Sequence, residues 1–145
     1  YQMPAYEITA LENGPGKIGM GMIGTLEQPM SEMDFLHLLR ERFDARGIRY
    51  SAPTGRRVGT VAVLGGAGSF ALSQAITQGA DAYVSADFKY HDFFGAEGRI
   101  LIADIGHFES ERFTKNILHN YLMKKFTIFA VRLSEINTNP IHYLQ

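Results

Sequence analysis

The chain has 145 residues, of which 46% are hydrophobic, with a formal net charge of −1 and a pI near 6.6. This length is enough for one buried core, so we expect a single domain. Without an excess of Lys and Arg, the chain lacks the electrostatic basis for binding long nucleic acids or an anionic membrane surface. The absence of cysteine excludes disulfides, thiolate catalysis and Cys-ligated zinc, so any metal would be held by nitrogen and oxygen ligands.

The sequence carries no sign of export or membrane insertion. No segment approaches the roughly 20 apolar residues of a membrane span, and the N-terminal residues lack the basic-then-apolar order of a signal peptide. We therefore expect a cytoplasmic protein without a membrane partner. The chain begins at Tyr1, which simple removal of an initiator Met would not normally expose, so we expect a fragment.

The first 47 residues predict two strands and a helix. Residues 5–11 alternate loosely between apolar and polar, and residues 13–16 (Asn-Gly-Pro-Gly) then favour a turn. Residues 18–26 predict a short strand with a bulge, because the apolar positions change register. A helix is expected after Ser31, which is a good N-cap, and Gly47 is expected to end it.

From residue 58 onward, short apolar segments alternate with segments of helical length. This alternation predicts β-α-β units with right-handed crossovers and a sheet covered on both faces. We therefore expect an α/β fold, a layered α/β/α domain with a mostly parallel sheet. The predicted strands are residues 58–64, 82–86, 100–103 and 127–131, and the predicted helices are residues 69–78, 88–97 and 110–125.

The chemistry-bearing residues follow the predicted parallel strands. The carboxyl ends of such strands share one edge of the sheet, where ligands usually bind. We expect that edge to collect the loop 65–69, Asp87, His91 and the turn 104–107. Nearly all the candidate chemistry would then lie in one place.

Residues 66–71 (Gly-Ala-Gly-Ser-Phe-Ala) fit the pattern G-x-G-x-x-[G/A] between a strand and a helix, and Asp87 ends the next strand. The pattern is typical of dinucleotide binding, in which backbone N–H groups approach a pyrophosphate and the Asp accepts from a ribose hydroxyl. The alternative is a glycine-rich turn that simply packs tightly at a crossover.

His107 and Glu111 stand at the start of the last predicted helix, and their i, i+4 spacing would let an imidazole nitrogen and a carboxylate oxygen converge. This would be half of a metal site; the alternative is an ion pair or a helix-start cap. Asp104 would accept from the ring N–H of a metal-bound histidine, or cap the loop. His91 is a candidate general acid or base, or a histidine satisfied by a neighbouring carbonyl.

Three motifs together resemble the second half of the Nif-three-like family, whose members are also known as GTP cyclohydrolase type-two homologues. They are residues 65–69 (GGAGS), 79–91 (GADAYVSADFKYH) and 104–111 (DIGHFESE), and the resemblance runs from about residue 58 to the tail 137–141 (NTNPI). Residues 19–31 resemble the family's re-entry from an inserted domain. The resemblance implies that residues 1–17 are the end of that domain and a linker, and that residues 18–145 are the C-terminal half of the α/β domain.

The resemblance also carries implications for the site. It implies a fold of two similar halves with a two-metal site between them, and assembly into a homo-oligomer, a hexameric ring. By motif, His107 and Glu111 correspond to the metal ligands of the second half, whereas the first-half ligands have no counterpart here. Two divalent ions would bind per full-length subunit, with zinc, iron and manganese as candidates.

The resemblance implies a metal-dependent hydrolase acting on a nucleotide or related small molecule. In the intact protein His91 would move a proton or contact substrate, and the fragment alone is expected to be inactive. The alternative from a different class is a non-enzymatic module that binds a nucleotide or a protein through residues 66–87.

Overall fold

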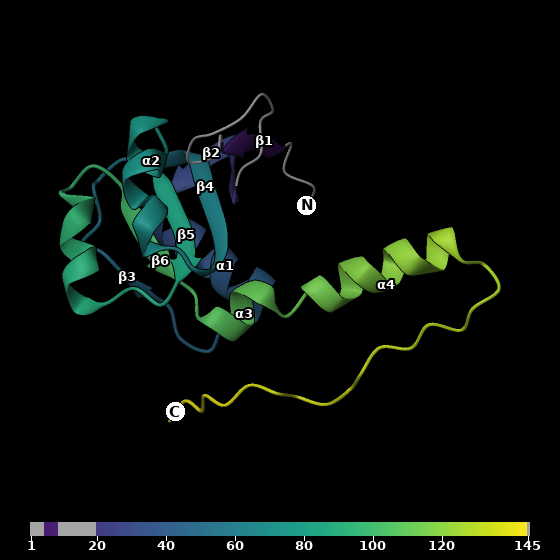
Figure 1. The fold of residues 1–145 in the computed structure, drawn as a ribbon. Helices are drawn as coiled ribbons and strands as arrows, with labels where there is room; N and C mark the ends of the chain where they lie inside the picture. The colour runs from purple at the N-terminus through teal and green to yellow at the C-terminus, as the bar shows by residue number, and fades with distance from the viewer. Residues whose placement is uncertain (1–4, 9–19, 145) are drawn as a thin grey trace.

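The computed structural model describes residues 5–8 and 20–144. Within these residues a six-stranded sheet has the order β1-β2-β4-β5-β6-β3 (Figure 1). The strands are β1 Ala5–Ile8, β2 Gly21–Ser31, β3 Arg49–Tyr50, β4 Arg57–Ala67, β5 Ala82–Ala86 and β6 Leu101–Asp104. The helices are α1 Glu32–Phe43, η1 Ser69–Ala71, α2 Leu72–Thr77, η2 Tyr90–Ala96, α3 His107–Glu111 and α4 Thr114–Lys125.

The sheet is parallel at its centre. β5 pairs in parallel with both β4 and β6, whereas β1, β2 and β3 join the sheet through antiparallel pairs. The predicted α/β fold is confirmed, with antiparallel strands outside a parallel core. Because β4, β5 and β6 run the same way, their carboxyl ends lie at one edge, as expected for a ligand site.

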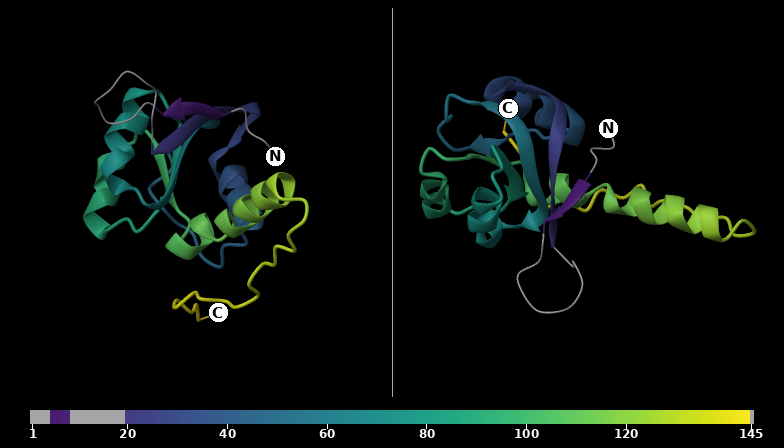
Figure 2. Two further views of the ribbon diagram at one scale, coloured as in Figure 1. Left: turned by 45° about the vertical axis from the view of Figure 1, so that its right-hand side comes forward. Right: turned by 90° about the horizontal axis from the view of Figure 1, so that it is seen from above.

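Two apolar clusters cover the two faces of the sheet. Figure 2 shows α1 on one side of the sheet and α2 with η2 on the other. Every residue of β5 and β6 is buried, as expected for strands covered on both faces. The α2 side is built around Leu64, Leu72, Tyr83, Phe88, Ile100 and Ile102, and the α1 side around Phe35, Leu36, Leu39, Val61, Val84 and Leu101.

The first part of the chain follows the prediction with shifted boundaries. β2 is longer than expected and continues to Ser31, with a register shift between Thr25 and Met30. Ser31 caps α1, and its hydroxyl oxygen accepts from the backbone N–H of Asp34 at 3.1 Å. The helix ends at Asp44 in the left-handed region (φ 47°), before the predicted stop at Gly47. The predicted turn at residues 13–16 and the boundary at residue 17 lie outside the described residues.

The C-terminal region differs more from the prediction. The helix expected over residues 110–125 begins earlier, at His107, and is interrupted between α3 and α4. The strand expected over residues 127–131 is wrong, because these residues are irregular. The outer edge of β6, where a right-handed crossover would place the next strand, is already paired with β3. Among the described residues, no helix has both the length and the apolar character needed to cross a bilayer.

Candidate metal centre

The carboxyl ends of β4, β5 and β6 bring three predicted site residues together. The Nδ1 atom of His107 lies 2.6 Å from Oδ2 of Asp87. A Cβ atom added to Gly66 would lie 3.3 Å from Nε2 of His107. The prediction of a shared sheet edge is therefore confirmed for Gly66, Asp87 and His107.

A buried carboxylate shapes the turn that starts α3. Asp104, at the end of β6, accepts hydrogen bonds from the backbone N–H groups of Phe88 and Gly106, both at 3.1 Å, and from the guanidinium of Arg49. Gly106 has φ 93°, which favours glycine, and any Cβ there would lie 2.3 Å from a carboxylate oxygen of Glu109. Of the two roles considered for Asp104, the structure thus supports the cap on the loop. Asp104 fixes the point at which α3 begins.

Because α3 begins at His107, Glu111 lies one turn later on the same face. The Nε2 atom of His107 is 3.3 Å from Oε2 of Glu111. The two side chains are about half exposed, at 46% and 52%. The sequence spacing therefore produces the predicted convergence of an imidazole nitrogen and a carboxylate oxygen on one solvent-accessible point.

The electrostatics of His107 favour a positive charge at this point. The pKa of His107 is raised, first by the hydrogen bond to Asp87 and further by the negative charges of Asp87 and Glu111, while partial burial opposes the shift. In neutral His107 the proton on Nδ1 would be donated to Asp87, leaving the lone pair of Nε2 facing the Glu111 carboxylate. Two lone pairs so close repel unless a proton or a metal cation lies between them.

The pair has the separation expected of two ligands of one ion. Two atoms bound at about 2.0–2.2 Å to a tetrahedral zinc are about 3.3 Å apart, and a carboxylate on the other imidazole nitrogen is the usual support for a metal-bound histidine. Within residues 5–8 and 20–144, no group of three or more His, Asp or Glu side chains is placed to hold an ion. His107 and Glu111 thus fit part of a coordination sphere and would need further ligands.

Gly66 makes room for this pair. It has φ 69°, and an added Cβ would lie 2.6 Å from Oε1 of Glu111. Its backbone N–H donates to the hydroxyl of Ser110 at 2.8 Å, and that hydroxyl donates to the carbonyl of His107. A Cβ on Gly68 would lie 2.1 Å from the hydroxyl of Ser85. Packing against the protein's own residues therefore accounts for both glycines of the G-x-G motif.

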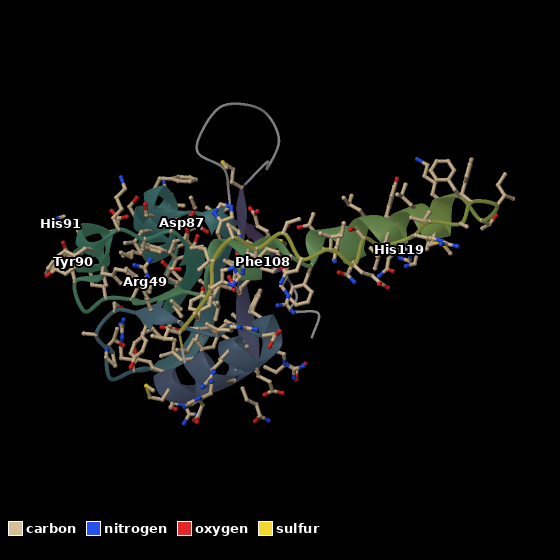
Figure 3. The ribbon with its side chains drawn as sticks, turned by 90° about the horizontal axis from the view of Figure 1, so that it is seen from below. Arg49, Asp87, Tyr90, His91, Phe108 and His119 are labelled. Carbon is tan, nitrogen blue, oxygen red and sulfur yellow. The ribbon has the colours of Figure 1, made fainter. Side chains whose placement is uncertain are left out.

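His91 lies apart from the metal pair. Its ring is stacked on Phe94 and meets the edge of Tyr90, with centroid distances of 6.2 and 5.2 Å. In Figure 3, His91 and Tyr90 are at the far end of the domain from Phe108, with Asp87 between them. The residue that sequence reasoning missed as the partner of His107 is Asp87; its place at the end of the adjacent parallel strand was the available signal.

An open groove of about 800 Å³ adjoins the pair. His107 and Glu111 lie at its wall together with Phe113, and residues 134–141 of the C-terminal tail form the opposite side. The amide of Asn139 donates to the buried carboxylate of Glu109 at 3.4 Å. The candidate metal ligands are therefore accessible from a surface depression.

Comparisons with known proteins identify the family to which the chain is similar. The family model Duf34/NIF3 (NGG1p interacting factor 3) matches residues 4–140. The chain is 32% identical to a GTP cyclohydrolase 1 type 2 homolog of Bacillus subtilis, over 99% of this chain and 40% of the relative. It is 34% identical to the homolog of Mycobacterium leprae, over 97% of this chain and 38% of that relative.

Two solved structures are similar in fold. Staphylococcus aureus protein SA1388 matches with a TM-score of 0.76 and 27% identity, over 87% of this chain and 42% of the other. A Bacillus cereus protein related to NIF3 matches with a TM-score of 0.76 and 29% identity, over 92% of this chain and 38% of the other. The chain thus spans about 40% of the length of the curated relatives that it matches.

Proposed function

Since this chain belongs to the Duf34/NIF3 family, we propose that it supplies half of a dinuclear metal site in a metal-dependent hydrolase that acts on a nucleotide or related small molecule. The observation that carries the proposal is the position of the His107 ring between two carboxylates, those of Asp87 and Glu111. One carboxylate lies 2.6 Å from Nδ1 of the imidazole and the other lies 3.3 Å from Nε2. This arrangement orients a histidine for a cation.

Asp87, Glu111 and Gly66 each have a distinct role at His107. Asp87 holds the proton of His107 on Nδ1 and so leaves Nε2 available as a ligand. Glu111 supplies the anionic oxygen, and Gly66 keeps the space in front of both side chains open. A bound divalent ion would lower the pKa of a coordinated water and provide hydroxide near neutral pH. His91 would contact a substrate that extends as far as η2, or carry a proton there.

The remaining parts of the proposal concern the whole protein. We propose two divalent ions per full-length subunit, with zinc, iron and manganese as candidates, and ligands from outside this chain completing the coordination. A cytoplasmic homo-oligomer, a hexamer as implied by the family, would carry the site. A binding module that uses residues 66–87 is less well supported, because Asp87 contacts His107 and the glycines contact the protein's own side chains.

Metal binding tests the proposal directly. Zn²⁺ and Mn²⁺ are titrated into the chain while NMR follows the imidazole signals, a readout that also detects weak binding. We expect His107 to respond first, and we expect His107→Ala and Glu111→Ala to abolish the response. The matched control is the double variant His37→Ala/Glu41→Ala, which removes an exposed pair with the same i, i+4 spacing on α1. Equal metal binding by all variants would refute the proposed site. Hydrolysis is then assayed in a full-length relative, with and without metal.

A further inference from the structure

Asp87 and His107 meet beyond the paired part of the sheet. The parallel pairing of β5 and β6 extends to Ser85 opposite Asp104, and the backbone N–H of Ile105 donates to the carbonyl of Ser85 at 3.0 Å. Asp87 and His107 lie two residues beyond Ser85 and Ile105, respectively. Their contact at 2.6 Å therefore depends on how the turns after β5 and β6 are held against each other.

The carboxylate of Asp104 links these two turns. Its Oδ2 atom accepts from the backbone N–H of Phe88, the residue after Asp87, at 3.1 Å. Its Oδ1 atom accepts from the backbone N–H of Gly106, the residue before His107, also at 3.1 Å. The side chain of Asp104 is only 4% exposed, so water competes little for these bonds. One buried carboxylate thus binds directly beside each member of the Asp87–His107 pair.

Arg49 binds the same turn after β5. It belongs to β3, where it lies opposite Asp104 in the antiparallel register. Its Nη2 atom donates to the carbonyl of Phe88 at 2.8 Å and also to Oδ2 of Asp104. Its guanidinium carbon lies 5.6 Å from the centroid of the Phe93 ring. Both backbone polar groups of Phe88 are therefore bonded, the N–H to Asp104 and the carbonyl to Arg49.

The backbone of Asp87 shows why this turn has to be held. Its φ of 58° lies in the left-handed region, which a residue other than glycine keeps only where the surrounding structure determines it. The two bonds to Phe88 supply that constraint at the next residue. Without the bond from Arg49, the turn could relax and carry the Asp87 carboxylate away from Nδ1 of His107.

Neutralisation of Asp104 does not by itself account for an arginine here. A buried carboxylate needs a cation, and a lysine could supply that charge. The guanidinium of Arg49, however, also bonds the Phe88 carbonyl and lies against the Phe93 ring, although its side chain is 62% exposed. A planar guanidinium has several N–H donors in fixed directions and packs on aromatic rings, whereas an ammonium group acts as a point charge. These contacts therefore suit arginine rather than lysine.

We propose that Arg49 is a positioning residue for the candidate metal site: it fixes the turn after β5 so that the Asp87 carboxylate stays against Nδ1 of His107. The inference rests on the proposed function, in which Asp87 leaves Nε2 of His107 available to a cation. Arg49 acts through Phe88 and does not itself contact the ion. It follows that Arg49 controls which ring nitrogen of neutral His107 carries the proton, with or without metal.

Nitrogen-15 NMR of His107 tests this role, because at a pH above the pKa of His107 it reports which ring nitrogen is protonated. We expect the proton on Nδ1 in the unmodified chain. Arg49→Lys keeps the charge and Arg49→Met removes it; both should shift the proton toward Nε2 and weaken zinc binding by about tenfold. Urea unfolding checks that each variant is folded. The matched control is Arg56→Lys, because Arg56 also donates to a backbone carbonyl, that of Arg99, and it should change neither readout.

The outcomes separate the proposal from its alternatives. If Arg49→Lys keeps both the proton on Nδ1 and the zinc affinity, Arg49 acts only by its charge and the proposal is overturned. A second measurement needs no variant: the bonds to Phe88 and Asp104 should slow rotation of the Arg49 guanidinium and give separate NMR signals for Nη1 and Nη2. A freely rotating guanidinium would overturn the proposal even if the variants failed to fold. A shifted proton in Arg49→Lys, with no zinc binding by any form of the chain, would support the role of Arg49 and refute the metal site.

Discussion

The imidazole of His107 and the carboxylate of Asp87 face each other at 2.6 Å, although 20 positions separate them in the chain. Asp87 directly follows β5 and has a left-handed backbone (φ 58°), an uncommon conformation for a residue other than glycine. His107 follows the neighbouring parallel strand. The strained turn after β5 therefore carries the carboxylate that selects the proton position on His107.

Replacing Asp87 by Asn should lower the pKa of His107 toward its ordinary value of 6.5, because the largest cause of the upward shift is lost. A histidine whose pKa is raised in the folded state stabilises the fold below its unfolded pKa, and this contribution is lost as the pH rises through the folded pKa. The metal-free variant should therefore show a weaker dependence of stability on pH above 6.5. NMR titration of the imidazole and urea unfolding at several pH values measure both effects.

The same substitution should weaken metal binding by about 10–100-fold, the usual effect of removing a supporting carboxylate. Protons compete with the metal for Nε2, so the affinity of the unmodified protein should fall as the pH falls through the raised pKa of His107. Glu97→Gln, which alters an exposed ion pair with Arg99, is the control. An unchanged His107 pKa in Asp87→Asn would contradict the assigned role of Asp87.

Two glycines with positive φ provide a matched test of the space in front of the metal pair. Gly66→Ala should cost about 1–3 kcal/mol from backbone strain, and it should also abolish metal binding because the new Cβ would lie 2.6 Å from Oε1 of Glu111. Gly55 has φ 77° with nothing within 4 Å of an added Cβ. Gly55→Ala should therefore lose about 1–2 kcal/mol and keep the metal. Urea unfolding and zinc titration measure these effects, and retained metal binding in Gly66→Ala would refute the clash.

The central part of the fold could be predicted from the sequence because local signals and tertiary packing agree there. The strand at residues 82–86 was predicted with its exact bounds, and Ser31 was identified as the N-cap of α1. The strand predicted at residues 127–131 failed for a non-local reason, since local propensity says nothing about the edge of β6 already paired with β3. Competition for a sheet edge is settled by the whole topology.

The candidate site likewise combines a feature that local sequence predicts with features that depend on the tertiary structure. The convergence of His107 and Glu111 was predictable because it depends on helical spacing within one segment. The contact between Asp87 and His107 depends on the register of β5 against β6, in which Ser85 lies opposite Asp104. The space that Gly66 leaves for Glu111 depends on β4 and α3 meeting. Neither relationship has a local signature in the sequence.

The buried hydroxyl of Tyr83 should make the fold less stable at alkaline pH. Its hydroxyl donates to the carbonyl of Gly68 at 2.8 Å, and burial raises its pKa to about 12. The folded state thus retains the proton that the unfolded state loses near pH 10, so stability should fall as the pH rises above 10. Tyr83→Phe should lose about 1–3 kcal/mol near pH 8, where the carbonyl loses its donor, and should show a smaller alkaline loss. Tyr121→Phe, at an exposed position, is the control; equal alkaline slopes for Tyr83→Phe and the parent chain would contradict this explanation.

The chain by itself should self-associate weakly through α4 and residues 126–133. Exposed apolar side chains on α4 and on residues 126–133 lower their free energy by contact with any similar surface, and an unpaired strand-like segment promotes edge pairing. Sedimentation velocity should show a mean mass that increases with concentration, and Ile117→Asp/Ile128→Asp should restore the monomer. The exposed aromatic cluster on η2 provides the comparison, because Tyr90→Asp/Phe94→Asp changes another exposed apolar surface, at the far end of the domain. A parent chain that stays monomeric at high concentration would contradict this prediction. Self-association that only the η2 variant abolishes would assign the contact to the aromatic cluster and not to α4 and residues 126–133.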